Sequence, residues 1–442
     1  MQLTRSKLAI MVAAALAGSG CSLLKKGRPV TPVLGERISV LTNEIDVVID
    51  PASAALPVTL PAPVANAEWA QSGGNAAKSM GHLALPGALT RVWSVAIGRG
   101  TSLTARLGSP PVIGGGRVFT IDTTATVRAF DARNGALVWQ APFGREKGNS
   151  SSLFGGGVAY ANGRVYATNG LGFVAAIDAA SGALVWQVRP GGPLRGSPTV
   201  AGDAVYVMSQ DNQIYSLKTA NGATSWSQAA SLEIAGVFGT ASPAFAQGTL
   251  VAGFSSGELN AYRYENGRSV WQDALARTSI RTSVSTLSDI DADPVIDSGQ
   301  VIAIGQGGRM VALELISGQR MWELNVAGIS TPWVVGEWAF AVTDDAKVIA
   351  VSRATGKIRW ISQLQAFRNQ KRKTGQISYS GPVLAGNRLV LTRTTGQLMF
   401  LDPRTGTLLG GTSVGAPVSL PPVVANSTLY VLDDDGRLHA FR

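Results

Sequence analysis

The chain has 442 residues, of which 45% are apolar and 15% charged, and its formal net charge is +10. This composition excludes a disordered or collagen-like protein, and the single cysteine excludes a disulfide within the chain. The 52 glycines instead indicate many tight turns between short strands.

The first twenty residues have the form of a secretory signal peptide. Arg5 and Lys7 precede the apolar run LAIMVAAALAG (8–18), which is too short to span a bilayer. The following segment AGSGC resembles the lipobox of bacterial lipoproteins, with Gly18 where that family usually has leucine. The resemblance implies that Cys21 is lipidated, and an ordinary thiol beside a cleavage site is the alternative.

Residues 21–85 are predicted to form the lipidated N-terminus and a tether. The stretch PASAALPVTLPAPVANA (51–67) is rich in proline and alanine, so we expect a semi-extended segment with little core of its own. Three basic residues at 25, 26 and 28 either sit in a solvated linker or contact anionic headgroups. By resemblance to enterobacterial lipoprotein sorting, Ser22 implies the periplasmic face of the outer membrane.

Tryptophans then recur roughly every 45 residues, which is the spacing of propeller blades. They stand at positions 93, 139, 186, 226, 271, 322 and 360. The text before them repeats as well, for example AFDARNGALVW (129–139) and AIDAASGALVW (176–186). The seventh place of each copy is a glycine, which suits a hairpin turn with positive φ. We expect each indole to pack between neighbouring blades.

A second strand pattern precedes these copies and occurs eight times, from GRVFTID (116–122) to STLYVLD (427–433). The last unit stops at LHAFR (438–442), before its own glycine and tryptophan, while Trp93 has no first half. We therefore predict an all-β fold, an eight-bladed β-propeller over residues 86–442. An N-terminal strand that carries Trp93 would complete the last blade and close the ring.

One stretch, STLSDIDADPVIDSGQ (285–300), is unusually acidic for a basic chain. Asp289, Asp291 and Asp293 have the spacing of the first ligands in a calcium loop, but Pro294 replaces the glycine that the loop's sharp turn demands. A metal site is therefore not predicted. A plain solvated loop and a protein-docking loop remain as interpretations.

Catalysis and nucleic-acid binding are not indicated either. The two histidines, His82 and His439, complete no arrangement of nucleophile and base, and an exported chain has little access to nucleic acid. A basic stretch, RNQKRKTG (368–375), is interpreted as a solvated loop or as a binding site for an acidic partner or lipid headgroups.

The A-x-D-x-x-x-G-x-x-x-W repeat resembles the tryptophan-docking motif of pyrroloquinoline-quinone (PQQ) propellers. That superfamily includes quinoprotein dehydrogenases and the BamB lipoproteins of the outer-membrane β-barrel assembly (BAM) machinery. The lipobox-like start, the tether, the eight repeats and LSDIDADPVIDSG (287–299) together resemble the BamB family.

This resemblance implies a non-catalytic scaffold subunit without a cofactor. Such a subunit would dock on the POTRA domains of BamA, join other BAM subunits and assist the insertion of barrel proteins, and direct contact with unfolded precursors is left open. The alternative is a periplasmic propeller that binds a quinone cofactor or another small ligand. The chain lacks the second cysteine that the dehydrogenases' active-site disulfide needs.

The resemblance also implies where a partner would bind. In BamB proteins an SD-x-D loop contacts a POTRA domain, and the matching residues are Asp289 and Asp291, which we expect to project from the rim toward cations of the partner. A second family contact matches GVFGTASP (236–243) and places Val237 and Phe238 there. Phe238 stands where the family has arginine, which exchanges an ionic contact for an aromatic anchor. We expect both loops on one face of the disc.

Overall fold

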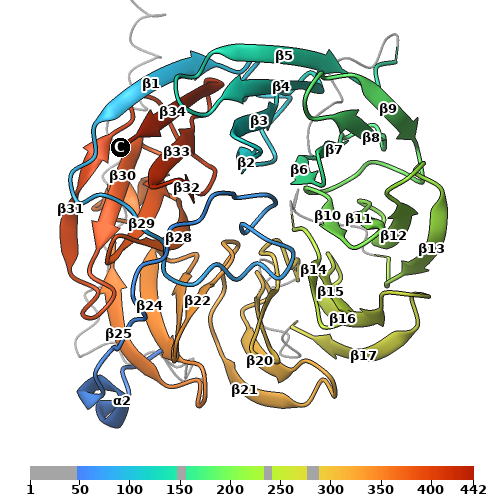
Figure 1. Cartoon of the computed structure of the whole chain (residues 1–442). Coiled ribbons are helices and arrows are strands. Elements are labelled where there is room, and N and C mark those ends of the chain that lie inside the picture. Colours follow the sequence, from blue (N-terminus) through green and yellow to red (C-terminus); the bar gives the residue numbers. More distant parts are fainter. Residues whose placement is uncertain (1–46, 147–155, 233–240, 276–287) are drawn as a thin grey trace, which may run out of the picture. The chain divides into compact units, whose positions relative to one another are not determined.

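The computed structural model describes residues 47–146, 156–232, 241–275 and 288–442. In these residues, eight four-stranded antiparallel sheets stand around one axis as the blades of a β-propeller (Figure 1). The all-β, eight-bladed fold predicted from the repeats is thereby confirmed. The only helix in the described part is α2 (Pro51–Ala55), and no helix there is long and apolar enough to cross a membrane. The predicted signal peptide (1–20) and Cys21 lie outside the described residues.

Each blade is a meander whose strands follow one another from the axis to the rim (Figure 1). The innermost strands of blades 1 to 8 are β2 (Val112–Gly114), β6 (Val158–Ala161), β10 (Thr199–Ala201), β14 (Ala244–Ala246), β18 (Val295–Asp297), β22 (Trp333–Val335), β28 (Tyr379–Ala385) and β32 (Val423–Ala425). The second strands are β3 (Arg117–Ile121), β7 (Arg164–Thr168), β11 (Ala204–Met208), β15 (Thr249–Gly253), β19 (Gln300–Ile304), β23 (Trp338–Val342), β29 (Arg388–Arg393) and β33 (Thr428–Leu432).

The outer half of each blade completes this order. The third strands are β4 (Thr126–Asp131), β8 (Val174–Asp178), β12 (Gln213–Lys218), β16 (Glu258–Arg263), β20 (Met310–Glu314), β24 (Lys347–Ser352), β30 (Gln397–Leu401) and β34 (Arg437–Phe441). The outermost strands are β5 (Leu137–Pro142), β9 (Leu184–Val188), β13 (Thr224–Ala229), β17 (Ser269–Ala274), β21 (Arg320–Leu324), β25 (Ile358–Gln363), β31 (Leu408–Ser413) and β1 (Arg91–Ala96). A separate two-stranded hairpin, β26 (Phe367–Asn369) and β27 (Thr374–Gln376), lies between blades 6 and 7.

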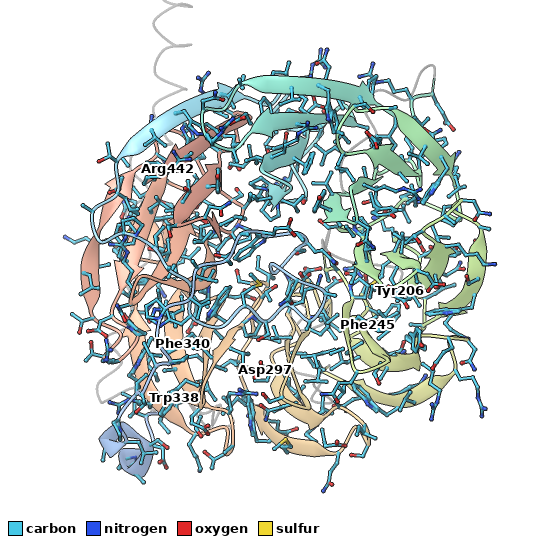
Figure 2. All side chains as sticks on the ribbon, viewed as in Figure 1. Tyr206, Phe245, Asp297, Trp338, Phe340 and Arg442 are labelled. Carbon is cyan, nitrogen blue, oxygen red and sulfur yellow. The ribbon has the colours of Figure 1, made fainter. Side chains whose placement is uncertain are left out.

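The second strands form the core because neighbouring blades cover both of their faces. All five residues of β11, β19 and β23 are buried, and their sequences are nearly continuous apolar runs. Outermost strands have one covered face at most, so β13 buries only its tryptophan. Aromatic rings join adjacent blades, as where Tyr206 of blade 3 stacks on Phe245 of blade 4 with ring centroids 6.1 Å apart (Figure 2).

The repeated tryptophans fasten each blade to the next. The Trp139 indole nitrogen donates to the Ala179 carbonyl oxygen at 2.9 Å, and its ring covers Gly182, where an added Cβ would lie 2.8 Å from the indole. The same glycine has φ +78°, as the turn pattern predicted. Seven junctions use this contact, each pairing a tryptophan of one blade with the turn glycine of the following blade.

Ring closure follows the prediction as well. Trp93 in β1 lies opposite Ala440 in β34, so an N-terminal strand completes the eighth blade. The junction from blade 7 to blade 8 lacks an indole, since Gly410 replaces the tryptophan. Blade 8 takes its third and fourth strands from opposite ends of the chain and therefore has no turn glycine to receive one.

The structure differs from the tether expected for residues 21–85 over the part that it describes, residues 47–85. Trp69 and Leu83 are only 3% and 1% exposed. Residues 66–83, named the belt here, cross the end of the ring in Figure 1 and bond to all eight blades in order. The bonds run Asn66 Nδ2–Val424 O (2.7 Å), Trp69 N–Ile113 O (2.9 Å), Tyr160 N–Ala70 O (2.7 Å), Val200 N–Gln71 Oε1 (2.9 Å), Phe245 N–Ala76 O (2.8 Å), Ile296 N–Ala77 O (2.9 Å), Trp333 Nε1–Gly81 O (2.8 Å) and Leu83 N–Leu384 O (3.1 Å).

These bonds explain why the belt, which is rich in small and polar residues, packs so closely. Each innermost strand pairs with the second strand on one side only, so the N–H and C=O groups of its inner edge need other partners. The belt supplies partners to the middle residues of these strands, such as Ile113 and Ile296, and to the turns that lead from them into the second strands, as at Asn426. Each innermost strand starts where the connection from the previous blade ends. The face of the propeller that carries these connections is called the connection face.

Candidate partner-binding site

The acidic stretch lies at the connection face, between blades 4 and 5. Residues 288–294 are described and lead directly into β18 (Val295–Asp297). Val237 and Phe238 lie outside the described residues. The stretch that contains them connects β13 to β14, as the acidic stretch connects β17 to β18. Both therefore follow an outermost strand and precede an innermost one, and the ends of their flanking strands lie at the connection face.

Asp289 and Asp291 do not project from the rim as we expected. Arg195, from the connection before β10, lies against both carboxylates: its Nη2 is 3.0 Å from Asp291 Oδ1 and 3.8 Å from Asp289 Oδ1. The side chains of Arg195, Asp289 and Asp291 are 3%, 0% and 8% exposed. The expectation was wrong because the stretch turns inward, so that an arginine two blades away reaches it.

Asp291 is the more exposed of the two carboxylates. Burial raises the pKa of Asp291 to about 7, and the charge of Asp289 adds to this, while Arg195 opposes it. The ionised form of Asp291 is therefore only partly stabilised by its surroundings. A further cation brought to this carboxylate would favour ionisation and would be bound by it in return.

The other two carboxylates of the stretch hold the belt. Asp293 accepts hydrogen bonds from Ser72 Oγ (2.5 Å) and Ser242 N (2.6 Å), and Asp297 accepts one from Ser79 Oγ (2.9 Å). Asp293 is 4% exposed, and burial raises its pKa while the charge of Lys78 opposes this. The acidic stretch thus has two roles, one at the connection face and one inside the ring.

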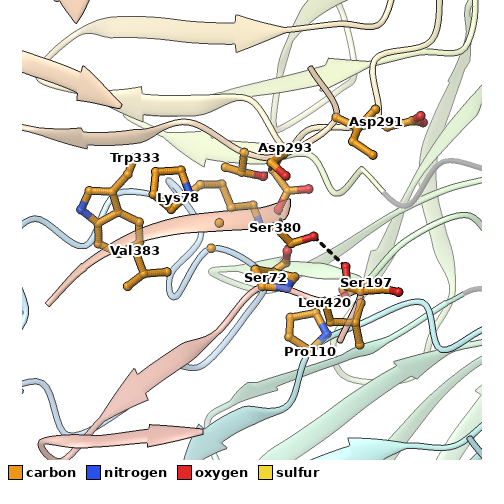
Figure 3. A pocket seen from close by; sticks show the side chains of 18 of the residues that line it. Ser72, Lys78, Pro110, Ser197, Asp291, Asp293, Trp333, Ser380, Val383 and Leu420 are labelled. Atoms are coloured by element: carbon orange, nitrogen blue, oxygen red, sulfur yellow. Dashed lines mark hydrogen bonds between the residues drawn. The ribbon is translucent and has the colours of Figure 1, made fainter. Parts of the chain in front are cut away.

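Lys78 is the cation at the centre of the belt. It is 2% exposed, and its Nζ donates to Thr199 Oγ1 at 3.1 Å. Burial lowers the pKa of Lys78 to about 8, and the charge of Asp293 limits the decrease. Figure 3 shows Lys78 beside Asp293, with Asp291 directed away from both.

A cavity of about 160 Å³ lies between the belt and the connection face. Trp69 and Lys78 of the belt line it together with Asp291, Asp293 and Trp333, as in Figure 3. Within the described ranges no three histidine, cysteine, aspartate or glutamate side chains are grouped so as to hold a metal ion. The aromatic walls, the hydroxyls and the buried charges of Lys78 and Asp293 make this a packed channel interior rather than a recognisable catalytic arrangement.

Sequence reasoning missed Arg195 and the interior role of Asp293, although a pattern in the repeats could have indicated the latter. Most blades begin with a small polar residue followed by proline, as at Ser109, Ser197, Ser242 and Thr331. Asp293 occupies that place in blade 5, which points to the interior instead of the rim. Arg195 stands two residues before such a serine and had no comparable pattern.

The sequence of the propeller is similar to that of a known protein family. The family model described as outer membrane protein assembly factor BamB matches residues 88–149, 123–362 and 365–442. The chain belongs to the BamB family. The match begins after the belt, so the belt lies outside the matched residues.

Individual BamB proteins are moderately similar to the chain. BamB of Yersinia pestis is 27% identical over 358 residues, covering 80% of this chain and 88% of the relative. BamB of Escherichia coli K12 is 25% identical over 395 residues, covering 79% and 88%.

Solved structures share the fold. The crystal structure of BamB from Moraxella catarrhalis has a TM-score of 0.66 at 18% identity and covers 80% of this chain and all 100% of that one. A quinohemoprotein alcohol dehydrogenase from Comamonas testosteroni has a TM-score of 0.64 at 14% identity, covering 85% and 80%. At these identities the similarity concerns the propeller alone.

Proposed function

We propose that this BamB-family chain is a non-catalytic scaffold subunit of the BAM complex that docks on the periplasmic POTRA region of BamA. The observation that carries the proposal is the Arg195–Asp289–Asp291 cluster at the connection face. In this cluster Asp291 accepts a hydrogen bond from Arg195 at 3.0 Å, and Asp289 lies 3.8 Å from the same nitrogen. Asp291 is 8% exposed and Asp289 is fully buried, and burial raises the pKa of Asp291 to about 7, so the ionisation of the outer carboxylate is incompletely stabilised. An arginine or lysine of the partner would bind Asp291 through a charge-assisted hydrogen bond.

The second contact in the proposal is the stretch with Val237 and Phe238. An aromatic side chain beside a charged pair is a common anchor in protein interfaces, because it buries a large apolar area at little entropic cost. The adjoining strand ends belong to β13 of blade 3 and β14 of blade 4, and the Asp289–Asp291 connection leaves blade 4 at the same face. The two contacts together would orient the propeller on its partner.

A pull-down from solubilised envelope tests the docking residues. Asp289→Asn/Asp291→Asn keeps the shape of both side chains and removes their charge, so recovery of BamA should fall well below that of the wild type. The control is Asp178→Asn/Asp402→Asn, two aspartates in turns on the opposite face whose carboxylates accept backbone N–H groups. Equal recovery with both double variants would contradict the docking assignment, and absence of BamA with the wild type would contradict the proposed function itself.

The proposal also includes a contact surface for barrel precursors on the rim. The outermost strands leave one edge unpaired, and several begin with two exposed apolar residues. Leu137 and Val138 are 53% and 44% exposed, and Leu408 and Leu409 are 50% and 58% exposed. An extended precursor with alternating apolar residues would match such an edge by adding a strand.

Membrane attachment through Cys21 completes the proposed function. Acyl chains on Cys21 would hold the chain at the periplasmic face of the outer membrane, since each buried methylene contributes about 0.8 kcal/mol. Fractionation of cells that express Cys21→Ser tests this: the variant should leave the outer-membrane fraction. Retention of the variant at the wild-type level would contradict the anchor without affecting the docking proposal.

A further inference from the structure

The hairpin β26–β27 is the one two-stranded sheet among the described residues that belongs to no blade. It interrupts the connection from β25 to β28 and therefore leaves the propeller at the connection face. Phe367 pairs with Gln376 and Asn369 with Thr374, and Asn369 Oδ1 accepts the backbone N–H of Arg372 at 3.0 Å across the turn. The loop expected from the sequence is thus an ordered arm.

The base of the arm is fixed to blade 7. Tyr379 Oη donates to the Gln365 carbonyl oxygen at 3.0 Å, and Arg393 Nη2 donates to Gln365 Oε1 at 2.6 Å. Ile377 N donates to the Ala366 carbonyl oxygen at 2.8 Å, and the Ile377 side chain is only 3% exposed. The propeller therefore holds the arm in place while its tip extends into solvent.

The tip is strongly basic. Arg368, Lys371, Arg372 and Lys373 are all exposed, and none of them forms an ion pair with a described residue. Asp345, in the turn between β23 and β24 of blade 6, has its own cation, since Lys347 Nζ lies 2.6 Å from Asp345 Oδ2. Four positive charges within six residues are thus available to a partner.

The composition of the tip favours one kind of partner. Residues 368–376 read RNQKRKTGQ and contain no apolar side chain. Protein interfaces centre on buried aromatic or aliphatic anchors, and the tip offers none. An anionic bilayer surface needs only positive charge at the right distance, and each basic residue near it strengthens binding by roughly fivefold.

We propose that the β26–β27 hairpin is a membrane-surface contact that binds the phosphate groups of anionic phospholipids. This contact is separate from the proposed acyl anchor and from the Asp289–Asp291 cluster, which lies two blades away. Together with a lipid anchor, such a contact would orient the connection face relative to the membrane instead of only tethering the chain to it.

Vesicle co-sedimentation tests the proposal with the chain from residue 22 onward, which contains every described residue and lacks Cys21. The probes are phosphatidylcholine vesicles with and without phosphatidylglycerol. The wild type should bind the anionic vesicles at low salt and be released by added salt, because the attraction is screened. Replacing all four cations of the tip by glutamine should weaken binding at least about tenfold.

A charge-matched control separates the hairpin from net charge. Lys218, Arg268, Lys357 and Arg404 are exposed on turns of the opposite face and form no ion pair with a described residue. Their glutamine variants should bind anionic vesicles nearly as well as the wild type. Both quadruple variants should keep the wild-type melting temperature, since all eight side chains are exposed.

Three results would overturn the proposal. In the first, the wild type binds neither kind of vesicle. In the second, the two quadruple variants lose binding equally, which would show a net-charge effect. In the third, the wild type binds only soluble polyglutamate, which serves as a model acidic polypeptide, and the hairpin variant does not bind it. That result would assign the hairpin to an acidic protein.

Discussion

Seven of the eight blade junctions use the same indole–glycine contact, whereas the belt bonds to the blades through a mixture of backbone and side-chain groups. The repeated contact recurs at seven junctions, from Trp93 on Gly135 to Trp360 on Gly406. The belt uses a backbone pair at blade 1, a glutamine side chain at blade 3 and a tryptophan donor at blade 6. The comparison shows that a repeat closes the ring, while a unique segment fills its centre.

Breaking the belt should have the largest effect on stability. Trp69 is 3% exposed and stacks on Trp333 with ring centroids 6.0 Å apart. Trp69→Ala leaves a cavity and should lower the free energy of unfolding by about 3–5 kcal/mol, measured by urea denaturation. Tyr264→Ala, at a side chain 39% exposed, is the control and should change little. A cost below about 1 kcal/mol for Trp69→Ala would mean that the belt is only loosely attached.

Breaking a blade junction should have the next largest effect. Gly182 and Gly163 both have positive φ, +78° and +73°, but only at Gly182 would a Cβ meet an indole, 2.8 Å away. Gly163→Ala should cost about 1–2 kcal/mol for its backbone conformation. Gly182→Ala should cost more in the same urea titration, because Trp139 must move as well. Equal costs would show that the indole contact adds nothing to the turn.

The pH dependence of stability tests whether the belt buries the amine of Lys78. The pKa of Lys78 is lowered from 10.5 to about 8 by burial, so between these pH values the unfolded chain binds more protons than the folded one. The contribution of Lys78 to the free energy of unfolding is therefore fully present above pH 10.5 and is lost as the pH falls through about 8. Lys78→Met should remove this dependence, whereas Lys357→Met, at an exposed lysine, should keep it. An unchanged slope in Lys78→Met would place the amine in solvent.

The smallest effect on stability is expected at the rim. Leu408→Ser/Leu409→Ser alters residues that are 50% and 58% exposed, so the free energy of unfolding should change by less than about 0.5 kcal/mol. Binding of an unfolded barrel precursor, followed by fluorescence anisotropy, should nevertheless weaken. Thr224→Ala/Ser225→Ala, at the matching positions of blade 3, is the control. Unchanged precursor binding would remove the rim from the proposed function.

The blades could be predicted because the same physical requirement recurs in each. A glycine with positive φ and an indole that covers it leave a pattern that seven copies make visible, and the broken copies at the two chain ends reveal the closure. The belt occurs once, and its bonds use mainly backbone atoms, which leave no pattern in side chains. The proline- and alanine-rich stretch 51–67 is mostly exposed, and the error was to extend the tether through residues 68–85, where the structure has a packed segment.

The acidic stretch was predictable only in part for the same reason. Asp289 and Asp291 were identified as an unusual pair, but their burial depends on Arg195, which lies about a hundred residues earlier and comes close only when the ring forms. Asp293 belongs to a repeated position and was nonetheless grouped with its neighbours. Charge pattern alone does not tell a carboxylate that faces solvent from one that faces the axis.

Site-specific photo-cross-linking tests the proposed docking face most directly. Ile329, 44% exposed on the connection between blades 5 and 6, and Tyr264, 39% exposed on a turn of the opposite face, are replaced in turn by a photoreactive amino acid in cells that contain the BAM complex. Docking through the connection face predicts an adduct with BamA from position 329 and none from position 264. An adduct from position 264 alone would contradict it.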